Sequence, residues 1–159
     1  MKQAPAAERV SLIPWPPILF VGALAGGWAL GRTAALDWPG LNDRPAHIIG
    51  LAFGIAGFAL AAWAIATFIR AGTTVWPDGR AKVLVTDGPF RRLRNPMYLA
   101  EVLLLLGLAE LTHNIWYTIL APVFALAVTW LAIGPEERHL EARFGDSYRT
   151  YKERTRRWL

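Results

Sequence analysis

Residues 97–133, "MYLAEVLLLLGLAELTHNIWYTILAPVFALAVTWLAI", contain two apolar runs separated only by the polar pair His113 and Asn114. The runs cover about residues 97–112 and about residues 115–133. A helix crosses the hydrocarbon of a bilayer with about 20 apolar residues, and about 17 is the lower limit. Because two polar residues leave room only for a tight turn, this stretch predicts an antiparallel hairpin of two membrane-spanning helices.

Two further apolar runs precede the hairpin, at about residues 15–32 and about residues 46–69. The chain of 159 residues is 54% hydrophobic and 18% charged, against about 45–50% and about 25% in soluble globular domains. Its eight tryptophans suit the interface between lipid headgroups and hydrocarbon. We therefore predict one all-α integral membrane domain over residues 1–159, with four transmembrane helices.

The distribution of Lys and Arg predicts how these helices are oriented. Two basic residues precede the first run, six lie in residues 70–96 and seven follow residue 133, whereas two lie between the first and second runs and none at the His113 turn. Basic residues favour the cytoplasmic side. We expect both termini and the loop before the third helix to be cytoplasmic, in a prokaryotic inner (plasma) membrane.

The charge also bears on partners and processing. Cytoplasmic arginines account for the net charge of +5, so we expect membrane lipids as partners and no nucleic acid. The first residues, "MKQAPAAERVSLIPWPP", carry an acid before the apolar run and no convincing cleavage site, which indicates a retained tail and not a signal peptide. The oligomeric state is left open.

The chain changes character after the fourth run. Gly134 and Pro135 predict a break followed by a new helix start, and a charged amphipathic helix is expected over about residues 135–157. It should lie on the membrane surface or over the bundle, with a possible interruption at Gly145. Its apolar stripe is spaced by four, four, three and four residues: Leu140, Phe144, Tyr148, Tyr151 and Thr155.

Polar residues flank the hairpin at its cytoplasmic end. Arg94, Asn95 and Tyr98 open the third helix, after a segment "AKVLVTDGPF" that suggests a short extended piece and a turn. Glu136 and Glu137 follow the fourth helix. Because the two helices form a hairpin, the two clusters should be neighbours. Carboxylates bind an ammonium group, and arginine and amide groups bind a carboxylate, so such a site can hold a zwitterion.

Two separated blocks carry a family resemblance. "GPFRRLRNPMYLAEVLLLLGLA" followed by "PEERHLEARFGDSYRTYKERTRRWL" resembles the isoprenylcysteine carboxyl methyltransferase and phospholipid methyltransferase superfamily, whose members are small membrane enzymes that use S-adenosylmethionine. Asn95 replaces the family's common histidine and Ala100 replaces its glycine. The matching positions are Gly88, Pro89, Phe90, Arg94, Pro96 and Tyr98 in the first block, and Glu136, Glu137, Leu140, Phe144, Gly145, Tyr148, Tyr151 and Arg157 in the second.

The resemblance implies S-adenosylmethionine as cofactor, held between residues 84–98 and the start of the last helix. It implies Glu137 and Arg157 as catalytic residues, with Arg157 projecting from the final helix toward the reacting group. The residues that it implies for cofactor binding are Val85, Gly88, Arg94, Asn95, Tyr98, Glu136 and Glu137.

The acceptor is expected to be lipophilic and to reach the site through the membrane. It is either a carboxylate, as in isoprenylcysteine, or a lipid amine. An amine must lose its proton before it can accept a methyl group, whereas a carboxylate needs no base. Since Asn95 cannot titrate as histidine does, the sequence leans toward an acceptor that is already anionic.

Other interpretations are open at this stage. A membrane reductase of the sterol-reductase type, using NADPH, resembles the same C-terminal region, and a non-catalytic protein that retains the fold is the third alternative. The spacing of possible ligands does not indicate a metal site, and His47, His113 and His139 are taken as structural or exposed residues. Glu110 is expected to reach water at the helix end. For Glu101, on the face of Tyr98, a functional role and a place near the helix end both stay open.

Overall fold

The computed structural model describes residues 15–36, 38, 44–73 and 83–159. Over these ranges the chain is helical and has no strand beyond one isolated bridge. The elements are α1 (Trp15–Thr33), α2 (Arg44–Arg70), the 3₁₀-helix η1 (Gly88–Arg91), α3 (Pro96–Thr112), α4 (Ile115–Val128), the π-helical turn η2 (Thr129–Ile133), α5 (Gly134–Phe144) and α6 (Asp146–Arg154). The four apolar runs thus form four long helices within two residues of the predicted starts.

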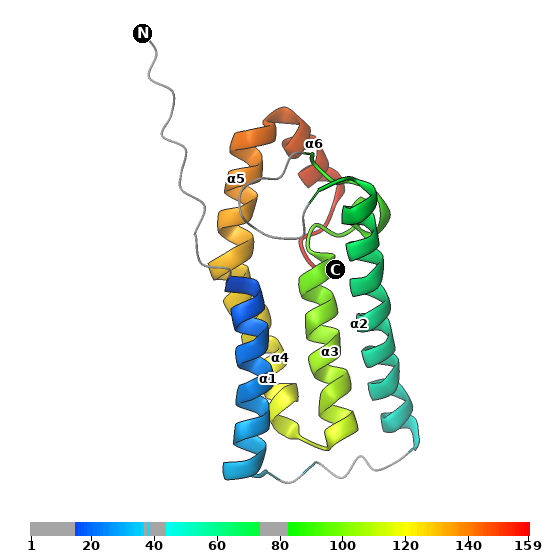
Figure 1. Ribbon diagram of the computed structural model, residues 1–159, viewed down its shortest axis with the longest axis vertical. Helices are drawn as coiled ribbons and strands as arrows, with labels where there is room; N and C mark the ends of the chain where they lie inside the picture. Colours follow the sequence, from blue (N-terminus) through cyan, green and yellow to red (C-terminus); the bar gives the residue numbers. More distant parts are fainter. Residues whose placement is uncertain (1–14, 37, 39–43, 74–82) are drawn as a thin grey trace.

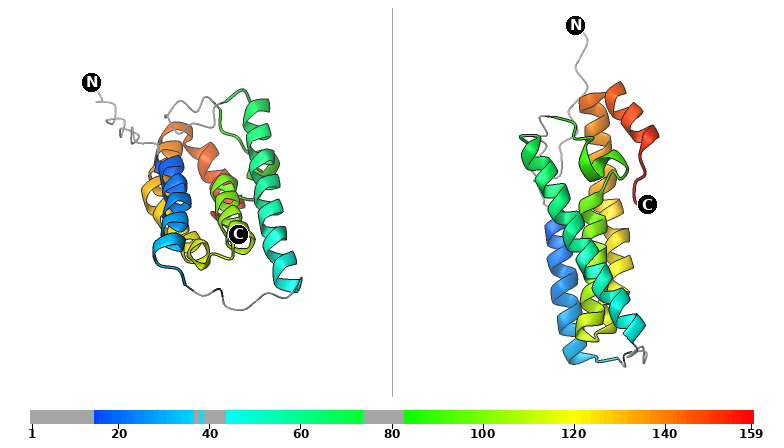
Figure 2. Two further views of the ribbon diagram at one scale, coloured as in Figure 1. Left: turned by 60° about the horizontal axis from the view of Figure 1, so that its bottom comes forward. Right: turned by 90° about the vertical axis from the view of Figure 1, so that its right-hand side faces the viewer.

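The long helices stand side by side in the order α1, α4, α3, α2 (Figures 1 and 2). The predicted hairpin of α3 and α4 is present. His113 ends α3 in the left-handed conformation with φ of 49°, and the side chain of Asn114 accepts a hydrogen bond from the backbone N–H of Trp116, 3.1 Å away. α5, α6 and the segment before α3 gather at the opposite end of the bundle, which we call the polar end (Figure 1).

Two helical stretches have the length and hydropathy of a membrane span, Arg44–Arg70 and the continuous run Ile115–Phe144. Only 17% and 28% of their most apolar windows are buried inside the protein, whereas the core helix of a soluble protein is mostly buried. Large side chains such as Phe58 and Trp130 point outward. This surface favours an integral membrane protein. α1 and α3 lie alongside with 19 and 17 residues, and their assignment as spans stays a prediction.

Glycines let α2 and α3 approach closely. A Cβ atom on Gly107 would lie 2.5 Å from the Cα atom of Gly54, and one on Gly57 would lie 2.8 Å from the carbonyl oxygen of Ala100. Membrane helices pack through small residues in this way because lipid is as apolar as the helices themselves. The contact fixes the position of α3, which carries part of the candidate site.

The predicted break at Gly134 and Pro135 is wrong. α4 continues through η2 into α5 as one helix of 30 residues. In η2 the backbone N–H of Gly134 bonds to the carbonyl of Thr129, five residues earlier. This wider turn makes room for the ring of Pro135, which in a regular α-helix clashes with the carbonyl four residues before it. Glu136 and Glu137 therefore stand on a direct extension of α4.

The C-terminal helix expected over about residues 135–157 is interrupted at Gly145, the position at which the sequence suggested a break, and forms two helices, α5 and α6. They meet at Gly145, where φ is +54°. Glycine adopts this conformation without the steric cost that other residues incur. α6 folds back over the segment before α3 (Figure 2), so Tyr148, Tyr151 and Thr155 are buried, whereas Leu140 and Phe144 are only half-buried.

The expected extended piece before α3 does not form a strand where the structure describes it. Residues 83–87 have no regular structure, and residues 81 and 82 lie outside the described ranges. The isolated bridge instead joins Leu93 to Arg156 in parallel. The chain end, and not residues 83–87, supplies the backbone partner of this segment.

Candidate active site at the polar end of the bundle

The end of the chain is fastened to the segment that precedes α3. The backbone N–H of Arg94 donates to the carbonyl of Arg156, and the N–H of Arg156 donates to the carbonyl of Arg92, at 2.8 and 2.9 Å. The buried hydroxyl of Tyr151 donates to the carbonyl of Phe90, 2.8 Å away. Three hydrogen bonds between residues more than sixty positions apart thus hold the end of the chain against the segment before α3.

Gly88 helps to seat this segment on α2. Its φ is +58°, and a Cβ atom at this position would lie 2.4 Å from the hydroxyl oxygen of Thr67. Both the conformation and the close approach require glycine. Gly88 therefore has a packing role in the structure, and neither it nor Val85 lines the cavity described below.

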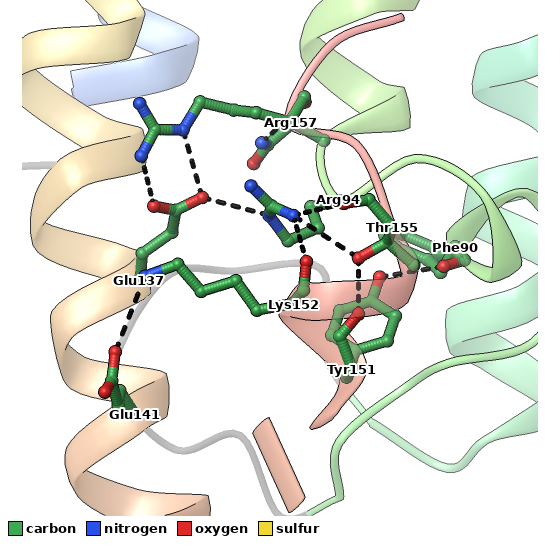
Figure 3. A network of polar contacts seen from close by, with 9 residues as sticks. Phe90, Arg94, Glu137, Glu141, Tyr151, Lys152, Thr155 and Arg157 are labelled. Carbon is green, nitrogen blue, oxygen red and sulfur yellow. Dashed lines mark hydrogen bonds and ion pairs between the residues drawn. The ribbon is translucent and has the colours of Figure 1, made fainter. Parts of the chain in front are cut away.

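Glu137 lies at the centre of an ion-pair network (Figure 3). Its Oε1 accepts from Nε of Arg94 and from Nε of Arg157, each at 3.1 Å, and its Oε2 accepts from Nη2 of Arg157. Nη1 of Arg94 also donates to the carbonyls of Lys152 and Thr155. Arg157 lies beyond the end of α6 at Arg154, so the expected projection from the final helix is wrong.

This network sets the ionisation of Glu137, which stands in α5 beyond the apolar run. Burial alone opposes the charged form, but the hydrogen bonds and positive charges of Arg157 and Arg94 outweigh it and hold the pKa of Glu137 below its usual value. Glu137 is 6% exposed. Its charge is therefore neutralised by the protein itself.

Asn95 is also engaged with the chain end. Its side-chain Nδ2 donates to the carbonyl of Arg157, 3.0 Å away, and the residue is buried. An amide N–H is sufficient for this bond. In the structure Asn95 thus secures Arg157 by its backbone while Glu137 holds it by its side chain.

A cavity of about 400 Å³ opens beside this network, a size within the usual range of small-molecule sites. Arg94, Asn95, Tyr98 and Glu136 lie in its wall, so the structure brings together four of the predicted site residues. The full set of lining residues is Pro16, Pro17, Ile65, Phe68, Phe90, Arg94, Asn95, Pro96, Met97, Tyr98, Glu101 and Glu136.

Tyr98 and Glu136 join the two predicted clusters directly. The hydroxyl of Tyr98 donates to Oε2 of Glu136 at 3.2 Å, which confirms that the start of α3 and the start of α5 are neighbours. Burial, together with the charge of Glu137, raises the pKa of Glu136, although the bond from Tyr98 acts against it. The pKa values of the two adjacent acids thus shift in opposite directions, because Glu137 faces arginines and Glu136 faces the cavity.

Glu101 is the lining residue whose role sequence reasoning left undecided. It lies three residues after Tyr98 on α3, and its Oε2 is buried without a hydrogen-bond partner among the residues that the structure describes. Glu101 and Glu136 give the cavity two carboxylates. The lining cation, Arg94, already gives Nε and Nη1 to protein acceptors.

Residues of the first two helices were missed altogether. Pro16 and Pro17 of α1 and Ile65 and Phe68 of α2 close the cavity on its apolar side. Helices that look like generic membrane spans carry no sequence signal of this role. The two prolines at the start of α1 are the one unusual feature there.

Comparison with known protein families gives one match. A model of the phospholipid methyltransferase family matches residues 45–147, more than half of the chain. The chain belongs to the phospholipid methyltransferase family. The matched region runs from α2 into the start of α6 and includes Arg94, Asn95, Tyr98 and both acids of α5, while α1 and Arg157 lie outside it.

One relative shares the sequence over a shorter range. A protein of Haemophilus influenzae that is described only as uncharacterised is 40% identical over 63 residues, which is 40% of this chain and the whole of that protein. No protein of solved structure matches the chain significantly. The family points to a membrane methyltransferase.

Proposed function

We propose that the protein transfers a methyl group from S-adenosylmethionine to a lipophilic acceptor that reaches the polar end through the membrane. The observation that carries this proposal is the cavity in which the Tyr98–Glu136 pair and Glu101 meet an apolar wall from α1 and α2. A family match that names phospholipid methyltransferases supports it.

The cavity suits the charges of S-adenosylmethionine, which has a positive sulfonium, a positive ammonium and a negative carboxylate. Glu136 would face the ammonium group of the cofactor, which leaves Glu101 to the acceptor. Among the described residues, Arg94 bonds to Glu137 and the chain end through Nε and Nη1 and not through Nη2, and this third nitrogen would hold the carboxylate. The cofactor supplies a methyl group on a sulfur that leaves as a neutral thioether.

In this proposal Glu137 and Arg157 act through Arg94 and the chain end and not by contact with the cofactor. They orient Arg94 and fix the chain end against the cavity, so they are positioning residues. Their direct catalytic role, which the family resemblance implies, stays a prediction.

The acceptor that fits best is a lipid amine, contrary to the leaning from sequence. Glu101, the carboxylate left for the acceptor, would repel an anionic acceptor and attract an ammonium group. An amine must lose a proton before methyl transfer, and the unpartnered Oε2 of Glu101 is available to take it. The apolar side chains of Ile65 and Phe68 would contact the acyl chains.

The proposal includes an orientation. The bias of Lys and Arg favours a cytoplasmic polar end, on the side where S-adenosylmethionine is made, and this orientation requires all four long helices to span the inner membrane. The His113 turn then faces the other side.

A dinucleotide fits the cavity less well than S-adenosylmethionine does. The phosphates of NADPH require several cationic or N–H donors, and Arg94 is the one cationic lining residue within the described ranges. This favours methyl transfer over reduction. A non-catalytic role predicts that neither cofactor binds.

Calorimetric titration of the detergent-solubilised full chain with S-adenosylmethionine and with NADPH tests the proposal. We expect binding of S-adenosylmethionine alone, weakened at least tenfold by Glu136→Gln and unchanged by Glu141→Gln, which alters an exposed acid one turn away from Glu137. Binding of NADPH alone, or of neither, would refute the methyltransferase assignment.

The acceptor is tested separately with labelled cofactor and two lipophilic substrates, phosphatidylethanolamine and a prenylated cysteine carboxylate. We expect methylation of the amine, with a rate that rises with pH, and a loss of rate in Glu101→Gln while cofactor affinity is kept. Methylation of the carboxylate alone would overturn the choice of acceptor and leave the cofactor proposal standing.

A further inference from the structure

A second group of polar side chains lies at the end of the bundle opposite the cavity, where α2 begins and α3 ends (Figure 1). It consists of His47, Glu110 and His113. Each of the three offers one nitrogen or oxygen atom, and these atoms all lie within 4.8 Å of one another. Nδ1 of His47 is 3.0 Å from Oε1 of Glu110.

Glu110 is placed differently from the sequence expectation. Its side chain does not extend into water but is buried, with 7% of the residue exposed, and it packs against Gly50 of α2. A Cβ atom on Gly50 would lie 2.2 Å from both Cβ and Cγ of Glu110. The absence of a side chain at Gly50 therefore creates the space for this carboxylate. A buried carboxylate requires a positive partner, and the side chain nearest to the carboxylate of Glu110 is His47.

His113 has an unusual backbone that brings its ring into the group. It adopts the left-handed conformation, which is uncommon for a residue other than glycine. Its ring lies 5.8 Å from the ring of His47 and 5.8 Å from the ring of Trp38, measured between centroids. Trp38 thus packs edge-on against His113, and both histidines are exposed.

We propose that His47, Glu110 and His113 bind a divalent transition-metal ion of the zinc type. Two imidazoles and one carboxylate form a ligand set that suits Zn²⁺, which takes three protein ligands and a water molecule in an open tetrahedral site. With bonds of about 2.0–2.1 Å, neighbouring ligand atoms stand roughly 3.4 Å apart. Rotation of the two exposed histidine side chains would bring the ligand atoms from their present separation to this spacing. The ion would then supply a positive charge next to the buried carboxylate of Glu110.

The site goes beyond the proposed methyl transfer, because it lies at the other end of the helices. A bound ion would join the start of α2 to the turn between α3 and α4. These two parts are far apart in the sequence and come together through the glycine contact of α2 and α3. The ion would therefore act as a clamp on the bundle.

The alternative is a histidine–carboxylate hydrogen bond with no metal. His47→Gln separates the two, because the glutamine amide can still donate to Glu110 but is a poor zinc ligand. His113→Asn is the second variant, since asparagine tolerates the left-handed conformation. His139 is the third histidine of the chain and lies in α5, at the polar end. His139→Gln is therefore a matched control.

The test is titration of the purified full chain, prepared without a histidine tag, with ZnCl₂ by calorimetry and with CoCl₂ by visible absorption. We expect one ion per chain and a tetrahedral Co²⁺ spectrum. We expect His47→Gln and His113→Asn each to weaken binding at least tenfold, while His139→Gln and addition of MgCl₂ leave it unchanged.

The melting temperature provides a readout that does not depend on activity. Zn²⁺ should raise the melting temperature of the wild type and of His139→Gln, but not that of His47→Gln or His113→Asn. The proposal is overturned if the wild type binds no zinc, or if His47→Gln and His113→Asn bind it as tightly as the wild type does.

Discussion

Glu137→Gln is the substitution that most directly tests how the polar end is held together. It keeps the size and one acceptor oxygen of the side chain but removes the negative charge between Arg94 and Arg157 (Figure 3). The amide nitrogen then faces a guanidinium, so one donor loses its partner. We expect α6 and the chain end to loosen from the segment before α3.

The structure sets the size of the effect. The side chains of Arg94 and Glu137 are 11% and 8% exposed, and a hydrogen bond to a charged group under such conditions contributes about 1.5–3 kcal/mol. Arg157 is 43% exposed, so its pair is screened and contributes about 1 kcal/mol at most. Since glutamine keeps one acceptor, we expect a loss of about 2 kcal/mol in the free energy of unfolding, which lowers the melting temperature by roughly 4–8 °C in a chain of this size.

The assay is thermal unfolding of the solubilised protein, followed by circular dichroism, with Glu141→Gln as the control. Glu141 lies one turn further along α5 and contacts two cations, Arg149 and Lys152, but all three side chains are solvent-accessible. Its substitution should leave the melting temperature within error. Equal shifts in the two variants, or no shift in Glu137→Gln, would refute the claim that burial makes the Glu137 network stabilising.

Two further predictions concern pH and packing. The pKa of Glu137 is lower in the folded protein than its usual value of 4.5. The contribution of Glu137 to stability is therefore complete above pH 4.5 and is lost as the pH falls through the folded pKa. The difference in unfolding free energy between wild type and Glu137→Gln should shrink at low pH, and a constant difference would contradict this. Gly107→Ala should destabilise the protein by about 1–3 kcal/mol, because its Cβ atom would meet the Gly54 backbone at 2.5 Å. Gly22→Ala, which meets nothing within 4 Å, should be neutral or stabilising, and equal effects in the same unfolding assay would argue against the close contact of α2 and α3.

The start of α3 and the start of α5 illustrate how far the sequence leads. The turn at His113 is short, so a hairpin of these two apolar runs brings the start of α3 and the end of α4 to the same end of the bundle. The structure confirms this and places the hydroxyl of Tyr98 3.2 Å from Oε2 of Glu136. Which acid would face the cavity did not follow from the pattern. That depends on the rotation of α5 about its axis, which the π-helical turn before Pro135 sets.

Two other features could not be predicted because they join distant positions. Gly50 and Glu110 each have an ordinary interpretation alone, a small residue in a membrane helix and an acid near a helix end. Only the packing of α2 on α3 places them in contact and brings His47 within reach. Similarly, the fold-back of α6 at Gly145 is what allows Arg157 to meet Glu137.

The apolar helices, the hairpin and the pair of polar clusters could be predicted from the amino-acid sequence, because helix length and charge bias depend on local composition. Which charges neutralise one another and which face a cavity is seen only in the folded protein. Those outcomes depend on how the helices are rotated and how closely they pack, and both are set by contacts between residues that lie tens of positions apart.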